Sequence, residues 1–287
     1  MSARSLVAHF CQKESLNFIL SNRVPRRLVT RLVGWFSTIE QPLIRNLSMA
    51  IWRFFCDLDL SDAKKKHFVS LRDCFIRELK EGARPIDQDP KILVAPCDGI
   101  VGCCGRIVSG ELLQVKGSVY PLEELLRERA LAKFYHDGWY ATLRLTAGMY
   151  HRFHAPHDCR VERVRHIWGD TWNLNPAALS RIEKLFCRNE RAVICARLAA
   201  TGQLITIVPV AAILVAGIRL SFADFVLDAR KSTDLPSDTT FRKGEEMGWF
   251  EHGSTIIILA PRDGLLLYDT VQAGRIFRMG EPLMRLL

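Results

Sequence analysis

The spacing of apolar residues changes character along the chain, and the first part is helical. Between residues 15 and 56, apolar side chains recur at helical intervals and form one stripe. The clearest stretch of this stripe is Leu28, Leu32, Trp35 and Phe36. Arginines crowd its start, Pro25 suits a first turn, and LIRNLSMAIWRFF repeats the same mix. The pattern therefore predicts amphipathic helices here.

A further helix is predicted over residues 61–83. Ser61 can cap its start and Gly82 can end it. The proline-rich stretch RPIDQDP then marks a boundary. We therefore expect residues 1–85 to form a helical, basic region.

Beyond residue 90 the pattern changes to short apolar runs broken by Gly, Pro, Asp and Asn, which is typical of strands. The runs are KILVAP, IVGCCGRIV, WYATLRLTA, CRVERVRHIW, AVICARLAA, LITIVPVAAILVAGI, STIIILAP and GLLLYD. The longest of them, residues 204–218, contains Pro209 and is expected to form core strands with a break. One helix is predicted at PLEELLRER. The expected fold class is α+β, with residues 86–287 as a mostly antiparallel β-rich domain.

The composition is that of a globular protein, and its charge indicates an anionic partner. Of 287 residues, 48% are hydrophobic and 25% charged, and the formal net charge is +9. Residues 1–55 hold eight basic and two acidic residues, so six of the nine excess charges lie there. Nucleic acid, a phospholipid surface or an acidic substrate would each match this charge.

The basic N-terminal helices favour a membrane surface. No stretch reaches the roughly 18 to 20 apolar residues that a bilayer span requires. A basic pair of amphipathic helices bearing Trp is typical of a protein that lies on an anionic membrane. The alternative is two ordinary helices packed on the core.

The nine cysteines are irregularly spaced, and no secretory segment precedes them. We therefore expect reduced thiols and no structural zinc site.

Three places in the β region carry more polar chemistry than packing needs. Asp98 lies in APCDGIV, where Asp-Gly could also be a hairpin turn. His151, His154 and His157 lie in MYHRFHAPHDC. They invite a metal hypothesis, but no Glu completes a metalloprotease pattern, and no metal is expected. The third is Ser254 in GWFEHGSTIIIL, next to a buried strand.

Asp98, His154 and Ser254 could form a charge-relay triad, since geometry and not chain order defines one. The GxSxG elbow of α/β-hydrolases is absent, because positions 252 and 256 are His and Ile. A Ser-His-Asp lipid hydrolase with intact Ser254 nevertheless stays an alternative.

A Gly-Ser bond also permits self-cleavage. The Ser254 Oγ can attack the carbonyl carbon of Gly253, which has no Cβ to block the approach. His154, oriented by Asp98, could take the hydroxyl proton. β-Elimination from the resulting ester and hydrolysis release ammonia and leave a pyruvoyl group. Its ketone can form an imine with a substrate amine and accept the electrons of a departing carboxylate.

Several ordered motifs together resemble the phosphatidylserine decarboxylase proenzymes of the membrane-associated bacterial and mitochondrial type. The resemblance runs from about residue 25 to the end. It rests on RPID, PCDGIV, QVKGSVYPLEELL, YHRFHAP, NERAVI and KGEEMGWFEHGSTIIIL.

The resemblance implies cleavage between Gly253 and Ser254 into a β chain (1–253) and an α chain (254–287). Ser254 would become the covalent pyruvoyl cofactor. Asp98, His154 and Ser254 match the residues that drive self-cleavage, and His151 would assist decarboxylation or position the substrate. The family's usual LGST reads HGST here, with His252 in place of Leu. A histidine there could change the pH dependence of self-cleavage.

The implied reaction converts phosphatidylserine to phosphatidylethanolamine and carbon dioxide. The expected partners are an anionic phospholipid membrane and the two chains of one precursor, with no nucleic acid; a homodimer stays open. The expected location is the cytoplasmic face of a bacterial inner membrane, with the mitochondrial inner membrane as the second candidate. A pyruvoyl decarboxylase of a different amino-acid-containing substrate and a non-catalytic basic binding domain would also be compatible with the sequence.

Overall fold

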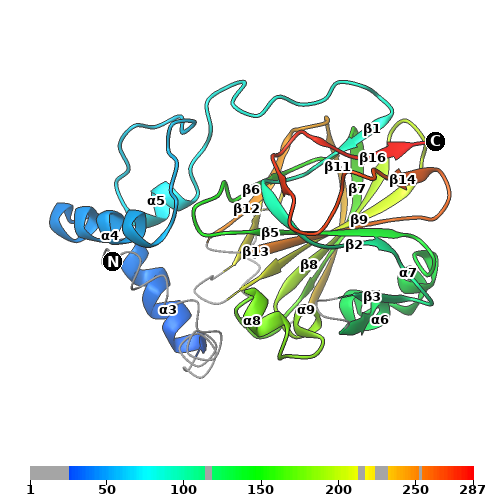
Figure 1. Cartoon of the computed structure of the whole chain (residues 1–287), viewed down its shortest axis with the longest axis horizontal. Coiled ribbons are helices and arrows are strands. Elements are labelled where there is room, and N and C mark those ends of the chain that lie inside the picture. Colours follow the sequence, from blue (N-terminus) through cyan, green and yellow to red (C-terminus); the bar gives the residue numbers. More distant parts are fainter. Residues whose placement is uncertain (1–25, 114–117, 213–216, 224–231, 252–253) are drawn as a thin grey trace.

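An antiparallel sheet of eight strands forms the body of the chain in the computed structural model (Figure 1). The structure describes residues 26–113, 118–212, 217–223, 232–251 and 254–287. The strand order in this sheet is β11-β7-β8-β9-β13-β5-β2-β15, and all of its pairings are antiparallel. The predicted α+β class with a mostly antiparallel sheet is therefore confirmed.

The strands of the large sheet contain most of the predicted apolar runs. They are β2 (Gly99–Arg106), β5 (Trp139–Leu145), β7 (Cys159–Ile167), β8 (Arg191–Leu198), β9 (Leu204–Ala211), β11 (Thr233–Phe241), β13 (Ser254–Ala260) and β15 (Ile276–Phe277).

Strand β13 lies inside the sheet and begins at Ser254. All of its residues are buried, because it is paired on both sides and its side chains enter the core. Ser254 is opposite Leu145 of β5 on one side and Ala211 of β9 on the other. The aliphatic run STIIIL thus fixes Ser254 at the end of a rigid element.

Pro209 lies within β9, and the predicted break comes after it. The pairing of β8 with β9 is interrupted between Ile207 and Val210, so the missing N–H of Pro209 falls where the ladder is open. The next strand in the described residues is β10 (Ile218–Leu220).

A small sheet places the histidine motif beside the segment that precedes Ser254. Its order is β10-β12-β6, with β12 at Glu246–Phe250 and β6 at Arg152–His154. A side chain at Gly248 would bring a Cβ 2.1 Å from the Arg219 carbonyl oxygen, so glycine is required for this close pairing. Two other sheets complete the β region: β1 (Ile92–Val94), β16 (Pro282–Leu286) and β14 (Leu265–Leu267), and β3 (Glu111–Leu113) with β4 (Val119–Pro121).

The N-terminal helices α3 (Arg26–Ser37) and α4 (Pro42–Phe55) lie at one side of the β body (Figure 1). They confirm the helices predicted from residue 26 onward; residues 15–25 lie outside the described part. Pro42 occupies the first turn of α4, and the Gln41 side chain accepts a hydrogen bond from Ile44 N at 2.8 Å. None of the helices in the described residues is long and apolar enough to cross a membrane.

The helix predicted over residues 61–83 is wrong. Only α5 (Leu71–Phe75) is helical there, and Ser70 caps it by accepting a hydrogen bond from Asp73 N at 3.1 Å. The flanking backbone pairs with itself instead, with a bridge between Ala63 and Leu79. Pairing between the two ends of this stretch and the Ser70 cap override its helical period.

Several short helices lie in the connections between the strands (Figure 1). The predicted helix at PLEELLRER is two: α6 (Leu122–Leu126) and α7 (Arg129–Phe134), separated by Arg127 in a left-handed conformation (φ 51°). Two more follow, α8 (Pro176–Leu179) and α9 (Leu185–Arg188). Arg191 of the NERAVI motif ties α6 to α9 by donating to the carbonyls of Glu124, Leu125, Cys187 and Asn189.

Candidate functional site

Ser254 is a buried nucleophile at the first position of β13. Its exposed fraction is 3%, and its Oγ makes no hydrogen bond to the described residues. Hydroxyls in such surroundings are ordinarily hydrogen-bonded, so an unsatisfied one requires a physical explanation. The predicted cleavage residue Gly253 and the unusual His252 lie outside the described residues.

His154, at the end of β6, is held as a neutral imidazole. Its Nδ1 lies 2.9 Å from the Gly244 carbonyl oxygen, which can only accept, so Nδ1 carries the proton. Its Nε2 lies 2.9 Å from the Tyr150 hydroxyl and accepts a hydrogen bond from it. Burial lowers the pKa of His154 from 6.5 to about 4, against a raising effect of the Gly244 hydrogen bond. The imidazole is therefore a proton acceptor at neutral pH.

Asp98 is buried between β1 and β2. The hairpin reading of Asp-Gly is wrong, because β1 pairs with β16 and β2 pairs with β5. The Asp98 carboxylate accepts hydrogen bonds from Arg84, at 2.9 Å from Nε and 2.6 Å from Nη2, and from Met279 N at 2.9 Å. Its oxygens are thus held in place by a guanidinium and a backbone amide.

The structure brings Asp98 and His154 into one neighbourhood. The His154 amide donates to the Pro96 carbonyl at 2.8 Å, and the charge of Asp98 raises the pKa of His154. Within the described residues, no hydrogen bond joins any two of Asp98, His154 and Ser254. A relay among the three would need local rearrangement, so their roles stay predictions.

His151 and His157 occupy separate environments. His151 is buried, with Nδ1 2.9 Å from the Met149 carbonyl oxygen and its ring 3.9 Å from that of Phe75 in α5. His157 Nε2 lies 2.9 Å from the Pro90 carbonyl oxygen. Among the described residues, no group of His, Cys, Asp and Glu is arranged to hold a metal ion.

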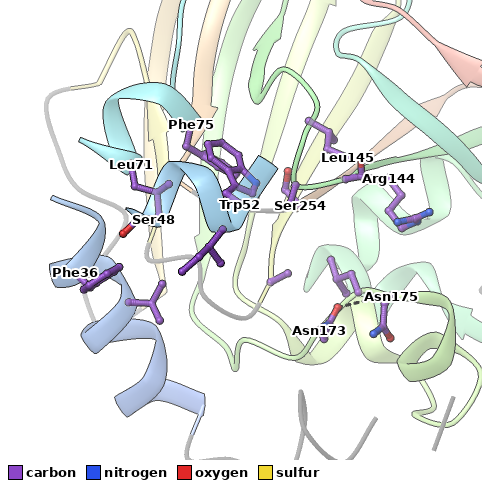
Figure 2. Close-up of a pocket in the computed structure, with 16 residues that line it drawn as sticks. Phe36, Ser48, Trp52, Leu71, Phe75, Arg144, Leu145, Asn173, Asn175 and Ser254 are labelled. Carbon is purple, nitrogen blue, oxygen red and sulfur yellow. Dashed lines mark hydrogen bonds between the residues drawn. The ribbon is translucent and has the colours of Figure 1, made fainter. Parts of the chain in front are cut away.

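An apolar cavity of about 520 Å³ has Ser254 in its wall. The cavity lies between the N-terminal helices and the large sheet, and Figure 2 shows side chains reaching it from both. Its lining is mainly apolar and comprises Val33, Phe36, Ser48, Ile51, Trp52, Leu71, Phe75, Arg144, Leu145, Thr146, Ala147, Asn173, Leu174, Asn175, Ala212 and Ser254. The site can receive a molecule with a long apolar portion.

Four residues of this site were not predicted from the sequence. Arg84 and Tyr150 belong to the quoted motifs RPID and YHRFH, which were the available signals for them. Glu251 immediately follows β12, and its carboxylate pairs with Arg72 and, at 3.1 Å, with Arg219. Arg144 lines the cavity, and nothing in its sequence surroundings distinguishes it from other strand arginines.

Comparison with known proteins identifies the family. Residues 71–285 match the family described as phosphatidylserine decarboxylase. Curated relatives named phosphatidylserine decarboxylase proenzyme share 34% identity in Haemophilus influenzae (strain KW20), 35% in Vibrio cholerae (O395) and 36% in Photobacterium profundum. The alignments cover 91%, 90% and 90% of this chain and 92%, 94% and 92% of the relatives. The chain belongs to the phosphatidylserine decarboxylase family.

Membership confirms the predicted resemblance. It makes the chain a carboxy-lyase and favours that class over the lipid hydrolase and the non-catalytic binding domain.

Proposed function

We propose that this chain is a self-processing decarboxylase that converts phosphatidylserine to phosphatidylethanolamine and carbon dioxide. One observation carries the proposal: Ser254, the serine of the Gly-Ser-Thr triplet, is a buried hydroxyl without a partner among the described residues, in the wall of an apolar cavity. A diacyl lipid has the long apolar portion that such a cavity accepts.

The residues around Ser254 fit a pyruvoyl group formed in place. The position is buried, Gly253 precedes it, and the cavity opens directly onto it. When formed, this group supplies a ketone that takes the substrate amine and accepts the electrons left by the departing carboxylate. All other steps depend on side chains of the chain itself.

In the precursor, His154 acts as the base for self-cleavage. Its Nε2 takes the Ser254 Oγ proton as Oγ attacks the Gly253 carbonyl carbon. The bond from that carbon to the Ser254 nitrogen then breaks, the nitrogen receives the proton from His154, and an ester remains. The Gly244 carbonyl keeps the required tautomer by holding the proton on Nδ1. Asp98 stabilises the imidazolium that forms, since its charge raises the pKa of His154.

After cleavage, His154 and His151 serve decarboxylation. His154 passes a proton from solvent to the carbon that has lost its carboxylate, and His151 positions the substrate. The apolar walls formed by residues such as Trp52, Phe75 and Leu145 exclude water, which favours loss of a charged carboxylate as neutral carbon dioxide.

The region of residues 1–85 holds the enzyme on the membrane through α3 and α4. Large apolar side chains of both helices face solvent, among them Trp35 (67% exposed) and Leu43 (74% exposed). Helix α4 buries none of its residues, so no described part of the chain covers its exposed face. With the N-terminal excess of positive charge, this surface suits peripheral binding to anionic lipid at the cytoplasmic face of a bacterial inner membrane.

The proposal is tested with purified protein, phosphatidylserine in mixed micelles, and the variant Ser254→Ala. Wild type should release carbon dioxide and form phosphatidylethanolamine, and Ser254→Ala should do neither and remain a single chain. Release of fatty acid or of head group by an uncleaved wild-type chain would instead establish a hydrolase.

A further inference from the structure

Arg144 is a partly buried cation with no partner in the described residues. It lies on β5 opposite Thr255 of β13 on one side and Ile100 of β2 on the other, next to the strand position that faces Ser254. No hydrogen bond or ion pair within the described part of the chain satisfies its guanidinium. Burial lowers its pKa, and no nearby acid offsets that effect. Arginine nevertheless stays charged at neutral pH.

Other buried arginines in the described residues have several hydrogen-bond or ion-pair partners. Arg191 donates to four backbone carbonyls, and Arg84 is paired with Asp62 and Asp98. Arg77 donates to the carbonyls of Cys74, Gly148 and Met149. A partly desolvated guanidinium without such partners is available to an anion, and binding of an anion offsets part of its desolvation cost.

The cavity that Arg144 lines has two chemically different sides. Figure 2 shows Phe36 and Leu71 on one side of Ser254, and Arg144 with Asn173 and Asn175 on the other. The first side comes from α3 and α5 and is apolar. The second side comes from β5 and the segment before α8. A molecule with apolar chains and an anionic head would place its reacting head near Ser254.

We propose that Arg144 binds the phosphodiester of the lipid substrate on the head-group side of this cavity. This inference rests on the proposed function and adds a residue that selects the substrate. Guanidinium groups bind phosphate oxygens through paired hydrogen bonds.

The phosphodiester suits Arg144 better than the serine carboxylate does. A cation on the carboxylate would stabilise the ground state more than the transition state, because that charge moves away as carbon dioxide leaves. The phosphodiester keeps its charge throughout the reaction, so Arg144 would stabilise the ground state and the transition state equally. Loss of uniform binding raises KM and leaves kcat unchanged.

The first test is Arg144→Met, which removes the charge and keeps much of the length of the side chain. With phosphatidylserine in mixed micelles, its KM should rise at least tenfold, with kcat per cleaved chain within threefold of wild type. The matched control is Arg106→Met on the neighbouring strand, whose exposed guanidinium stacks 4.8 Å from the Trp139 ring centre; its KM should not change. An unchanged KM in Arg144→Met, or a fall in kcat at unchanged KM, would overturn the proposal.

Two inhibitors separate the phosphodiester from the acyl chains. Phosphatidylmethanol carries the phosphodiester without the amine or the carboxylate. Diacylglycerol carries the acyl chains and no charged group. Arg144→Met should weaken competitive inhibition by phosphatidylmethanol at least tenfold and leave inhibition by diacylglycerol unchanged. Equal weakening for both lipids would contradict a phosphate contact.

If Arg144→Met does not process itself, the mature wild-type enzyme answers the same question. Phosphatidylmethanol should protect Arg144 from phenylglyoxal, as read by peptide mass mapping, and diacylglycerol should not. Modification of Arg144 at the same rate with and without phosphatidylmethanol would overturn the proposal. A failure of the proposed function itself looks different, because wild type would then release no carbon dioxide at all.

Discussion

The Tyr150 hydroxyl donates a hydrogen bond to His154 Nε2 at 2.9 Å, so the nitrogen that must accept the Ser254 proton is already occupied. Ser254 Oγ, by contrast, has no partner among the described residues. His154 Nε2 and Ser254 Oγ are therefore not hydrogen-bonded to each other. Self-cleavage therefore requires the Tyr150 hydroxyl to release Nε2.

Removing that hydroxyl should speed self-cleavage. Tyr150→Phe frees the Nε2 lone pair at the loss of one buried hydrogen bond of about 1 kcal/mol, which corresponds to a rate roughly fivefold higher. The measurement is the time course of precursor loss on denaturing gels. A Tyr150→Phe precursor that does not cleave would show instead that the hydroxyl relays the proton.

Acid should destabilise the precursor through His154. Its folded-state pKa is about 4 and its ordinary pKa is 6.5, so the unfolded chain binds more protons between these values. The stability from this group is complete above pH 6.5 and is lost as pH falls toward 4, by about 3 kcal/mol.

The comparison that isolates this effect uses urea unfolding of two uncleavable precursors. One carries Ser254→Ala alone and the other carries Ser254→Ala with His154→Gln. The free energy of unfolding should fall more steeply with acid in the first. Parallel pH profiles would mean that His154 is not a buried neutral base.

Glu251 should position the scissile segment, which begins immediately after it. The residue is 7% exposed. Its carboxylate pairs with Arg72 of α5 and, at 3.1 Å, with Arg219 of β10. Loss of a charged hydrogen bond of about 1.5–3 kcal/mol would loosen the end of β12. Glu251→Gln should therefore slow self-cleavage roughly tenfold or more.

Glu251→Asp is the conservative control and should restore part of the rate. Carbon dioxide release per cleaved chain should be equal in wild type and both variants, because Glu251 acts before the cofactor exists. A lower turnover per cleaved chain would place Glu251 in the decarboxylation step instead.

The exposed face of α4 should bind membranes. Leu43 and Leu47 are 74% and 61% exposed. Burial of each side chain in the lipid would stabilise the membrane-bound state by about 1.5–3 kcal/mol. Changing both to Ser should reduce co-sedimentation with phosphatidylserine vesicles at least tenfold and leave self-cleavage intact. Unchanged vesicle binding would assign the membrane contact to another surface.

The strand pattern was predictable because burial on both faces leaves a local signature. The run STIIIL predicted the strand that positions Ser254, and all residues of that strand are buried. The helix over residues 61–83 could not be excluded in this way, because the bridge between Ala63 and Leu79 depends on residues far apart in sequence.

The sequence singles out several residues of the candidate site but not their contacts. Asp98 and His154 stand out by type and motif. Their partners, Arg84 and Tyr150, depend on side-chain directions that the sequence pattern does not specify. Arg144 gave no signal at all, because an unsatisfied cation is recognised only when its surroundings are known.

The most direct test of the central claim is the intact mass of the purified wild-type protein. The account predicts two chains divided between Gly253 and Ser254, with the smaller one lighter by one ammonia than a serine-headed chain and reactive toward carbonyl reagents. An active preparation that gives one undivided chain, with no reactive carbonyl, would contradict it.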